Sequence, residues 1–274
     1  MTARGAGGAL LRFELAAARK GRTAPLFAAG FAVASVAIAL VGLSAGGVLA
    51  VQGFARTSVS LLQLVLWVVP LLALLTGAAA GAECYEIEYI AALPITRHEI
   101  VFSRWVAWVG ALGAALAIGL GAAGAVIAAF AGTADGWRYL GLVGLALLLL
   151  SACLATGLAI GVRVRDRGRA IAFAVVAWCV LVVGVDLVAI GLLAILPAGV
   201  ASWPLSLLLL LDPIDLARVL GLGLFSANEI AGPTGAALRA VMGGWGAVLL
   251  VAGLVAWTAV PLVVAARTFR TRDL

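Results

Sequence analysis

Long apolar stretches separated by short polar segments run through this chain of 274 residues. A helix needs about 20 apolar residues to cross the hydrocarbon core of a bilayer. Six stretches are long enough, near residues 24–48, 58–81, 103–131, 138–162, 170–197 and 243–265. The pattern therefore predicts an all-α polytopic membrane protein, with one transmembrane domain over residues 1–274 and six membrane-spanning helices.

Small residues recur at every fourth position of the third predicted span. They are Gly113, Ala117, Gly121, Ala125 and Ala129. A ridge of this kind lets the backbone of another helix approach closely. Spans rich in small residues are also expected to contact a second copy of the chain, although one sequence does not choose the face.

The segment 198–242 interrupts the apolar pattern. Its run from Trp203 to Leu211 is too short to cross a bilayer, and charged residues and prolines follow it. Short apolar pieces broken in this way favour an external interfacial or re-entrant element between the fifth and sixth spans. Within it we expect Asp212 to cap a helix that starts at Pro213.

Two interpretations of the polar residues in this region remain open. Asp212, Pro213, Asp215 and Arg218 suit a capped helix in which Asp215 pairs with Arg218 three residues later. They also suit a docking or gating element for a periplasmic partner. Asp186 lies about midway along the fifth span, where a carboxylate costs about 2.5–3.5 kcal/mol. It therefore either serves function or is a protonated or locally paired group that helps helices pack.

The basic residues predict the orientation of the chain. Of the 18 Lys and Arg, 14 lie in four stretches. These are Arg4–Arg22, Arg97–Arg104, Arg163–Arg169 and Arg267–Arg272. Basic loops stay cytoplasmic, so we expect cytoplasmic segments at 1–23, 82–100 and 266–274, and a periplasmic segment at 198–242. The net charge of +6 is then explained by contact with the lipid bilayer, and no nucleic acid is expected.

Composition argues against catalysis by this chain. Lys20 is followed by Gly21, whereas a nucleotide-binding P-loop needs a lysine followed by Ser or Thr. His98 is the single histidine, and the cysteines Cys84, Cys153 and Cys179 are widely spaced. We therefore expect that the chain is not an enzyme and has neither a metal site nor a bound cofactor. The first apolar stretch is too long for a cleaved signal peptide.

Residues 81–104, GAECYEIEYIAALPITRHEIVFSR, form the polar segment between the second and third spans. Apolar residues at helical spacing predict a short amphipathic helix at the cytoplasmic surface. Pro94 ends that pattern, and Thr96 with Glu99 forms a possible capping box for the next helix. A solvated loop and a helix docked onto a partner protein are both consistent with the segment.

The stretch EIEYIAALPITR, residues 86–97, resembles the coupling-helix signature of ABC type-2 permeases, which usually reads close to GTLEYLLSLPISR. The basic tail RTFRTRDL and the six-span layout are also similar to that family. The resemblance implies a permease that pairs with a second copy of itself and with two copies of a separate ATPase, which binds ATP and magnesium. It implies ATPase contacts at Glu83, Glu88, Tyr89, Pro94 and Arg97.

Residues 53–77 and 211–220 resemble, more narrowly, the permease of the transporter that matures nitrous oxide reductase. This resemblance implies a protein of the bacterial inner membrane that couples ATP hydrolysis to export or to a periplasmic maturation step. In that system a periplasmic accessory protein assists assembly of a copper–sulfur site. Two alternatives are a general type-2 exporter and a scaffold that transports nothing and relays motion to a periplasmic partner.

Overall fold

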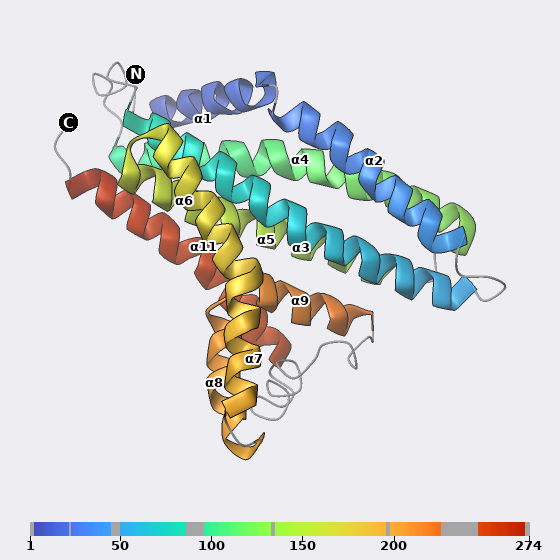
Figure 1. Cartoon of the computed structure of the whole chain (residues 1–274). Coiled ribbons are helices and arrows are strands. Elements are labelled where there is room, and N and C mark those ends of the chain that lie inside the picture. Colours follow the sequence, from blue (N-terminus) through green and yellow to red (C-terminus); the bar gives the residue numbers. More distant parts are fainter. Residues whose placement is uncertain are drawn as a thin grey trace.

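The computed structural model describes residues 3–21, 23–44, 50–85, 96–132, 135–195, 198–225 and 246–271, in which the regular elements are helices (Figure 1). The α-helices are α1 (Ala3–Lys20), α2 (Thr23–Ser44), α3 (Ala50–Ala82), α4 (Arg97–Ala131), α5 (Gly136–Val164), α6 (Arg167–Cys179), α7 (Val185–Ile195), α8 (Ala198–Leu210), α9 (Pro213–Leu224) and α11 (Gly246–Thr271). A 3₁₀ turn, η1 (Glu83–Tyr85), follows α3, and a π-helical segment, η3 (Val180–Gly184), joins α6 to α7.

Among the described residues, six helical stretches are long and apolar enough to cross a membrane. They are Thr23–Ser44, Arg56–Ala82, His98–Phe130, Gly136–Val164, Arg167–Ile195 and Gly246–Phe269. Each overlaps one of the six predicted spans, so the predicted all-α, six-span architecture is confirmed. The fifth of these stretches runs through α6, η3 and α7.

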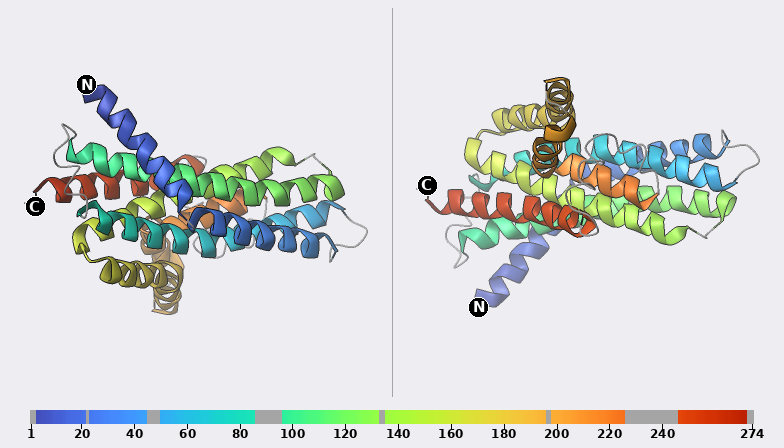
Figure 2. Two further views of the ribbon diagram at one scale, coloured as in Figure 1. Left: turned by 90° about the horizontal axis from the view of Figure 1, so that it is seen from above. Right: turned by 90° about the horizontal axis from the view of Figure 1, so that it is seen from below.

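The helices form an elongated bundle in which α3 packs most extensively on α5, α2 on α4, and α11 on α5 (Figures 1 and 2). The start of α1 and the end of α11 lie at the same end of this bundle, as does the turn between α5 and α6. The first and last described helices therefore begin and end at the same end of the bundle. That this side is cytoplasmic stays a prediction.

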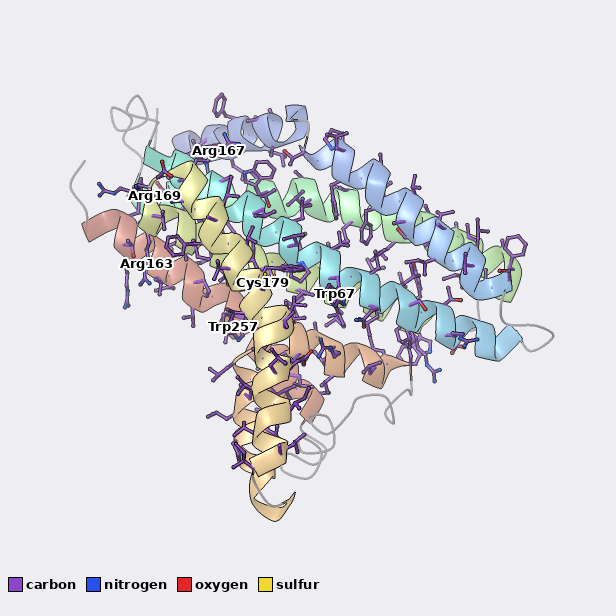
Figure 3. The ribbon with its side chains drawn as sticks, viewed as in Figure 1. Trp67, Arg163, Arg167, Arg169, Cys179 and Trp257 are labelled. Atoms are coloured by element: carbon purple, nitrogen blue, oxygen red, sulfur yellow. The ribbon has the colours of Figure 1, made fainter. Side chains whose placement is uncertain are left out.

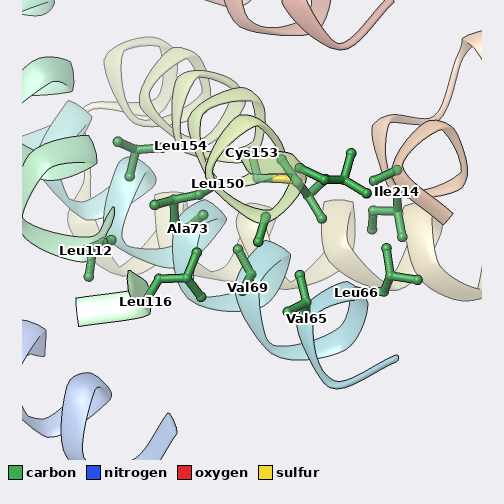
Figure 4. Close-up of a cluster of buried hydrophobic side chains, with 14 of the residues drawn as sticks. Val65, Leu66, Val69, Ala73, Leu112, Leu116, Leu150, Cys153, Leu154 and Ile214 are labelled. Carbon is green, nitrogen blue, oxygen red and sulfur yellow. The ribbon is translucent and has the colours of Figure 1, made fainter. Parts of the chain in front are cut away.

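Leucines from neighbouring helices fill the centre of the bundle (Figure 4). Leu112 and Leu116 of α4 meet Leu150 and Leu154 of α5, and all four are fully buried. Side chains of α3 and Ile214 of α9 extend this cluster. Thus α9 folds back onto the bundle; that it belongs to an external re-entrant or interfacial element stays a prediction.

Glycines bring α3 and α5 into direct backbone contact. Gly77 and Gly81 of α3 face Gly157 and Gly161 of α5. A Cβ atom added at Gly77 would lie 2.5 Å from the Leu154 carbonyl oxygen, and one added at Gly161 would overlap the Ala78 carbonyl oxygen. Because even a methyl group does not fit, this crossing depends on glycine at both helices.

Most of the small-residue ridge predicted on the third span is not packed against another helix. Gly113 is buried against Leu147 of α5. The next members, Ala117, Gly121 and Ala125, are exposed on α4. Within the described part of the chain, glycines thus bring the backbones of the second and fourth spans together, and the exposed part of this ridge contacts no helix in the same way.

Candidate functional site

The predicted cytoplasmic segment 82–100, called the coupling segment below, lies between two described helix ends. α3 continues into η1, which starts at Glu83. α4 starts at Arg97 with Thr96 as its N-cap, and the Glu99 carboxylate accepts a hydrogen bond from the Thr96 backbone nitrogen at 2.9 Å. The predicted helix start is confirmed. Glu88, Tyr89 and Pro94 lie outside the described residues, so the amphipathic helix and its ATPase contacts stay predictions.

Glu83 is joined to the fifth span by an ion pair. Its Oε1 lies 2.9 Å from Nη1 of Arg167, in the first turn of α6. The glutamate side chain is 34% exposed and the arginine 62%. Figure 3 shows Arg167 at this end of the bundle, together with Arg163 and Arg169. The pair therefore links the start of the coupling segment to a helix that is distant in sequence.

A buried network lies beside the described end of the same segment, at Ala80 and Cys84. Nη2 of Arg104 on α4 lies 3.0 Å from Oε1 of Glu14 on α1, and both side chains are 7% exposed. Nη1 of Arg104 donates to the Ala80 carbonyl oxygen at 2.8 Å and contacts Sγ of Cys84 at 3.5 Å. Burial raises the pKa of the Cys84 thiol, although the Arg104 charge opposes this. The network fastens α1, the end of α3 and the start of α4 together.

The sequence analysis did not predict this network, because it used Arg104 only as a marker of orientation and assigned residues 1–23 only as a cytoplasmic segment. Two signals were present. Glu14 is the only acidic residue before Glu83. Leu10, Glu14 and Ala18 recur at every fourth position, and all three are buried in α1. A glutamate within an apolar helical face indicates a partner cation on another helix.

A second polar cluster joins α7 to α9. Nη1 of Arg218 lies 3.0 Å from Oδ1 of Asp186 and 2.5 Å from Oδ1 of Asp215. Asp212 caps α9, accepting a hydrogen bond from the Ile214 backbone nitrogen at 2.8 Å, and Pro213 is the first helical residue. The predicted capping and the Asp215–Arg218 pair are confirmed.

One correction follows from this cluster. Asp186 and the group around Arg218 were predicted as two separate sites, one within a span and one outside. In the structure Arg218 contacts both Asp186 and Asp215. The locally paired alternative for Asp186 is thus the one seen. The partner was not predictable from order along the chain because 32 residues separate Arg218 from Asp186.

Burial shapes the electrostatics of this cluster. Asp212 is 1% exposed and Asp215 is 3% exposed. Burial, followed by the charge of Asp215, raises the pKa of Asp212 to about 8. Burial also raises the pKa of Asp215, against the effect of Arg218. The cluster can therefore hold α7 against α9 and take up or release a proton near neutral pH. Among the described residues, no group of three or more His, Cys, Asp and Glu is suited to hold a metal ion.

The two cysteines of the fourth and fifth spans differ in burial. Cys153 is fully buried on α5, whereas Cys179 is exposed at the end of α6 (Figure 3). Cys179 is therefore not a core residue of the single chain, and it lies on a face of the fifth span that is mostly uncovered.

Comparison with known proteins covers most of the chain. The sequence model of the ABC-2 family transporter protein matches residues 62–274. A probable ABC transporter permease protein NosY from Pseudomonas aeruginosa is 29% identical over 230 residues, which are 81% of this chain and 84% of that protein. A protein of the same name from Stutzerimonas stutzeri is 30% identical over 249 residues, 88% of this chain and 90% of that protein.

Proposed function

Because the chain belongs to the ABC-2 transporter family, we propose that residues 82–100 bind a separate ABC ATPase and transmit its closure on ATP to the membrane spans. The chain is a multi-pass permease of the bacterial inner membrane. Permeases of this family work with an ABC ATPase and as dimers. In the proposed complex two ATPase subunits bind ATP and magnesium, and the permease itself performs no bond chemistry.

The observation that supports this function most directly is how the two ends of the coupling segment are attached. Glu83 pairs with Arg167 of α6. Arg104, two turns into α4, binds Glu14 of α1 and the Ala80 carbonyl oxygen of α3. In this proposal a force on the segment reaches α3 and α4, which flank it, and also α1 and α6, which are distant from it in sequence. In this proposal the ATPase contacts are Glu83, Glu88, Tyr89, Pro94 and Arg97.

The test of ATPase docking is a charge reversal. Glu88→Arg should weaken co-purification of the ATPase subunit with the full chain by at least about tenfold, which corresponds to about 1.4 kcal/mol. The physical reason is that an arginine would replace an acidic side chain in the docked helix. Asp135→Arg is the matched control, since Asp135 lies between the third and fourth spans, at the other end of the bundle. This variant should bind the ATPase subunit as the wild type does. Full retention by Glu88→Arg would contradict docking at this position.

The narrower form of the proposal assigns the complex to maturation of nitrous oxide reductase. It is supported by the name NosY that both relatives carry and by the resemblance of residues 53–77 and 211–220 described above. In this form the element over residues 198–242 faces a periplasmic accessory protein during assembly of the copper–sulfur site. Asp212, Pro213 and Asp215 are buried, so they would act with Arg218 in gating and not by direct contact with that protein. Replacement of a NosY permease by this chain should restore that site in the reductase. If this chain bound the ATPase but did not restore the site, two functions would remain, a general exporter and a scaffold that relays motion. Measurement of substrate flux in proteoliposomes distinguishes them, because only the exporter transports a substrate.

A further inference from the structure

The second half of α4 and the first half of α5 enclose a narrow apolar groove. It lies at the end of the bundle opposite the start of α1 and the end of α11 (Figures 1 and 2), and its volume is about 330 Å³. On α4 the wall of the groove is made of small residues, namely Ala117, Gly121, Gly124, Ala128 and Gly132. Ala117 and Gly121 of the small-residue ridge therefore line a groove rather than a helix crossing.

The dimensions of the groove fit a single hydrocarbon chain. Ala117 and Gly132 are 15 residues apart, which is about 22 Å along a helix. One leaflet of a bilayer, with its headgroup layer, is about 20–22 Å thick. The volume divided by this length gives a mean cross-section of about 15 Å², whereas a helix with its side chains has a cross-section of about 80–110 Å². The groove thus has the depth of one leaflet and is too narrow to hold a helix.

The lining of the groove favours hydrocarbon over water. Besides the small residues of α4, it contains Ile127 of α4 and Gly136, Tyr139, Leu140 and Val143 of α5. Tyr139 supplies the one polar side-chain group among these described lining residues, and its hydroxyl donates to the Leu120 carbonyl oxygen at 2.6 Å. Apolar cavities of this kind stay dry, and an empty groove loses dispersion contacts along both walls. A flexible apolar chain restores those contacts.

The mouth of the groove carries groups that suit a phosphate. α5 begins there at Gly136, which lines the groove. Asp135 is the N-cap residue of α5, but its side chain makes no capping hydrogen bond with the described residues and instead pairs with Nη1 of Arg138 at 3.2 Å. The N-terminus of a helix attracts anions through its free backbone N–H groups. Nε of Arg138 is also buried without a hydrogen-bond partner among the described residues.

Trp137 marks the headgroup level at the same turn. Its side chain is 64% exposed, and the Arg138 guanidinium lies over its ring, 5.4 Å from the ring centroid. Tryptophan is enriched where membrane spans leave the hydrocarbon, and arginine side chains extend their charge to that level. A phospholipid with one chain in the groove would therefore have its phosphate beside Arg138 and the start of α5.

We propose that the groove between the third and fourth spans binds one glycerophospholipid from the leaflet on this side of the membrane, which is the outer leaflet in the predicted orientation. One acyl chain occupies the groove, and the phosphate lies at the N-terminus of α5 beside Arg138. The lipid fills the space that the side chains of these two spans leave open. The proposal is independent of the ATPase partner and of any transported substrate.

Photo-labelling of the purified full chain in phosphatidylcholine vesicles tests the proposal. The probe is a trace of phosphatidylglycerol with a diazirine midway along one acyl chain, and mass spectrometry of peptides locates the adducts. We expect adducts at lining residues such as Ala128 and Val143, and few at Val260, which is 60% exposed on the sixth span. Equal labelling of the groove and Val260 would indicate bulk lipid alone and overturn the proposal. Labelling of Val260 without the groove would indicate that a second copy covers this face, which would also overturn it.

A filled groove provides a second test. Gly121→Phe places a ring in the groove, and no described atom lies within 4 Å of an added Cβ at this position, so helix packing should be retained. Groove adducts should fall to the level at Val260. Gly144→Phe is the matched control, because Gly144 is an exposed glycine of α5 with the same open space and lies outside the groove lining. It should give the wild-type adducts. Unchanged groove labelling in Gly121→Phe would overturn the proposal.

A probe without phosphate tests the position of the headgroup. Diacylglycerol with the same photoactivatable chain should label the groove several-fold less than phosphatidylglycerol, because it brings no anion to the N-terminus of α5. Arg138→Gln should lower labelling by phosphatidylglycerol toward that level and leave labelling by diacylglycerol unchanged. Equal groove labelling of the wild type by the two probes would overturn the phosphate site.

Discussion

At the scale of single residues, Asp212 has the most informative titration. Its pKa is raised to about 8 by burial, compared with about 4 in an unfolded chain. Between these values the folded state holds a proton that the unfolded state has released. The resulting stability is complete below about pH 4, falls as the pH rises toward 8, and then levels off. Within this window each pH unit lowers the free energy of unfolding by about 1.4 kcal/mol.

We predict that Asp212→Asn reduces this pH dependence. Asparagine is as good an N-cap as aspartate, so α9 keeps its cap while the titrating group is lost. The measurement is the melting temperature in detergent at pH 6 and pH 8, where the wild type should lose more stability than the variant. Asp215, Asp186 and Arg218 remain, and Asp215 leaves a residual slope in the same direction because its pKa is also raised. Asp135→Asn, at a half-exposed pair, should keep the wild-type slope; an equal slope in Asp212→Asn would contradict the assignment.

Helix caps and long-range ion pairs differ in how far the sequence predicts them. The caps at Asp212 and Thr96 were predictable, because a cap depends on residues two or three positions away. The Glu14–Arg104 and Asp186–Arg218 pairs were not, since 90 and 32 residues separate the partners. Polar residues in apolar helices indicated that partners must exist, but only the fold identifies them.

At the scale of helices, the α3–α5 crossing leads to a prediction about packing. Gly161→Ala should lower the free energy of unfolding by about 1–3 kcal/mol, the usual cost of overpacking, because the new methyl group overlaps the Ala78 carbonyl oxygen. Gly144→Ala on the same helix is the control. It has open space among the described residues, so alanine should be neutral or stabilising. Thermal unfolding in detergent measures both, and equal melting temperatures would exclude direct backbone contact at this crossing.

Helix existence was largely predictable from the sequence, and helix pairing was not. The six spans follow from the number of consecutive apolar residues, which is a local property. The small residues of α4 and the glycines of α3 and α5 satisfy the same pairing rule. Among the described residues Gly157 and Gly161 are buried in a helix crossing, whereas Ala117 and Gly121 of the α4 ridge are exposed. The π-helical segment Val180–Gly184 had no signal in the apolar pattern.

At the scale of the whole molecule, the ion pair between Glu83 and Arg167 tests how motion passes from the coupling segment to the fifth span. Both side chains are substantially exposed, and exposed ion pairs contribute only about 0–1 kcal/mol to stability. We therefore predict that Arg167→Glu leaves the melting temperature nearly unchanged but reduces stimulation of the bound ATPase by the permease. The physical reason is that two carboxylates would repel each other where α6 now meets η1.

The exchanged pair, Glu83→Arg with Arg167→Glu, separates a role for the link from a role for either side chain. It restores opposite charges across the same gap, so stimulation of the ATPase in proteoliposomes should recover toward the wild-type value. Arg138→Glu is the control, because the Asp135–Arg138 pair is similarly open to solvent but joins residues of one turn. It should not alter stimulation. If the exchanged pair were as defective as Arg167→Glu alone, Arg167 would act through another contact, and the coupling segment would not drive the fifth span through Glu83.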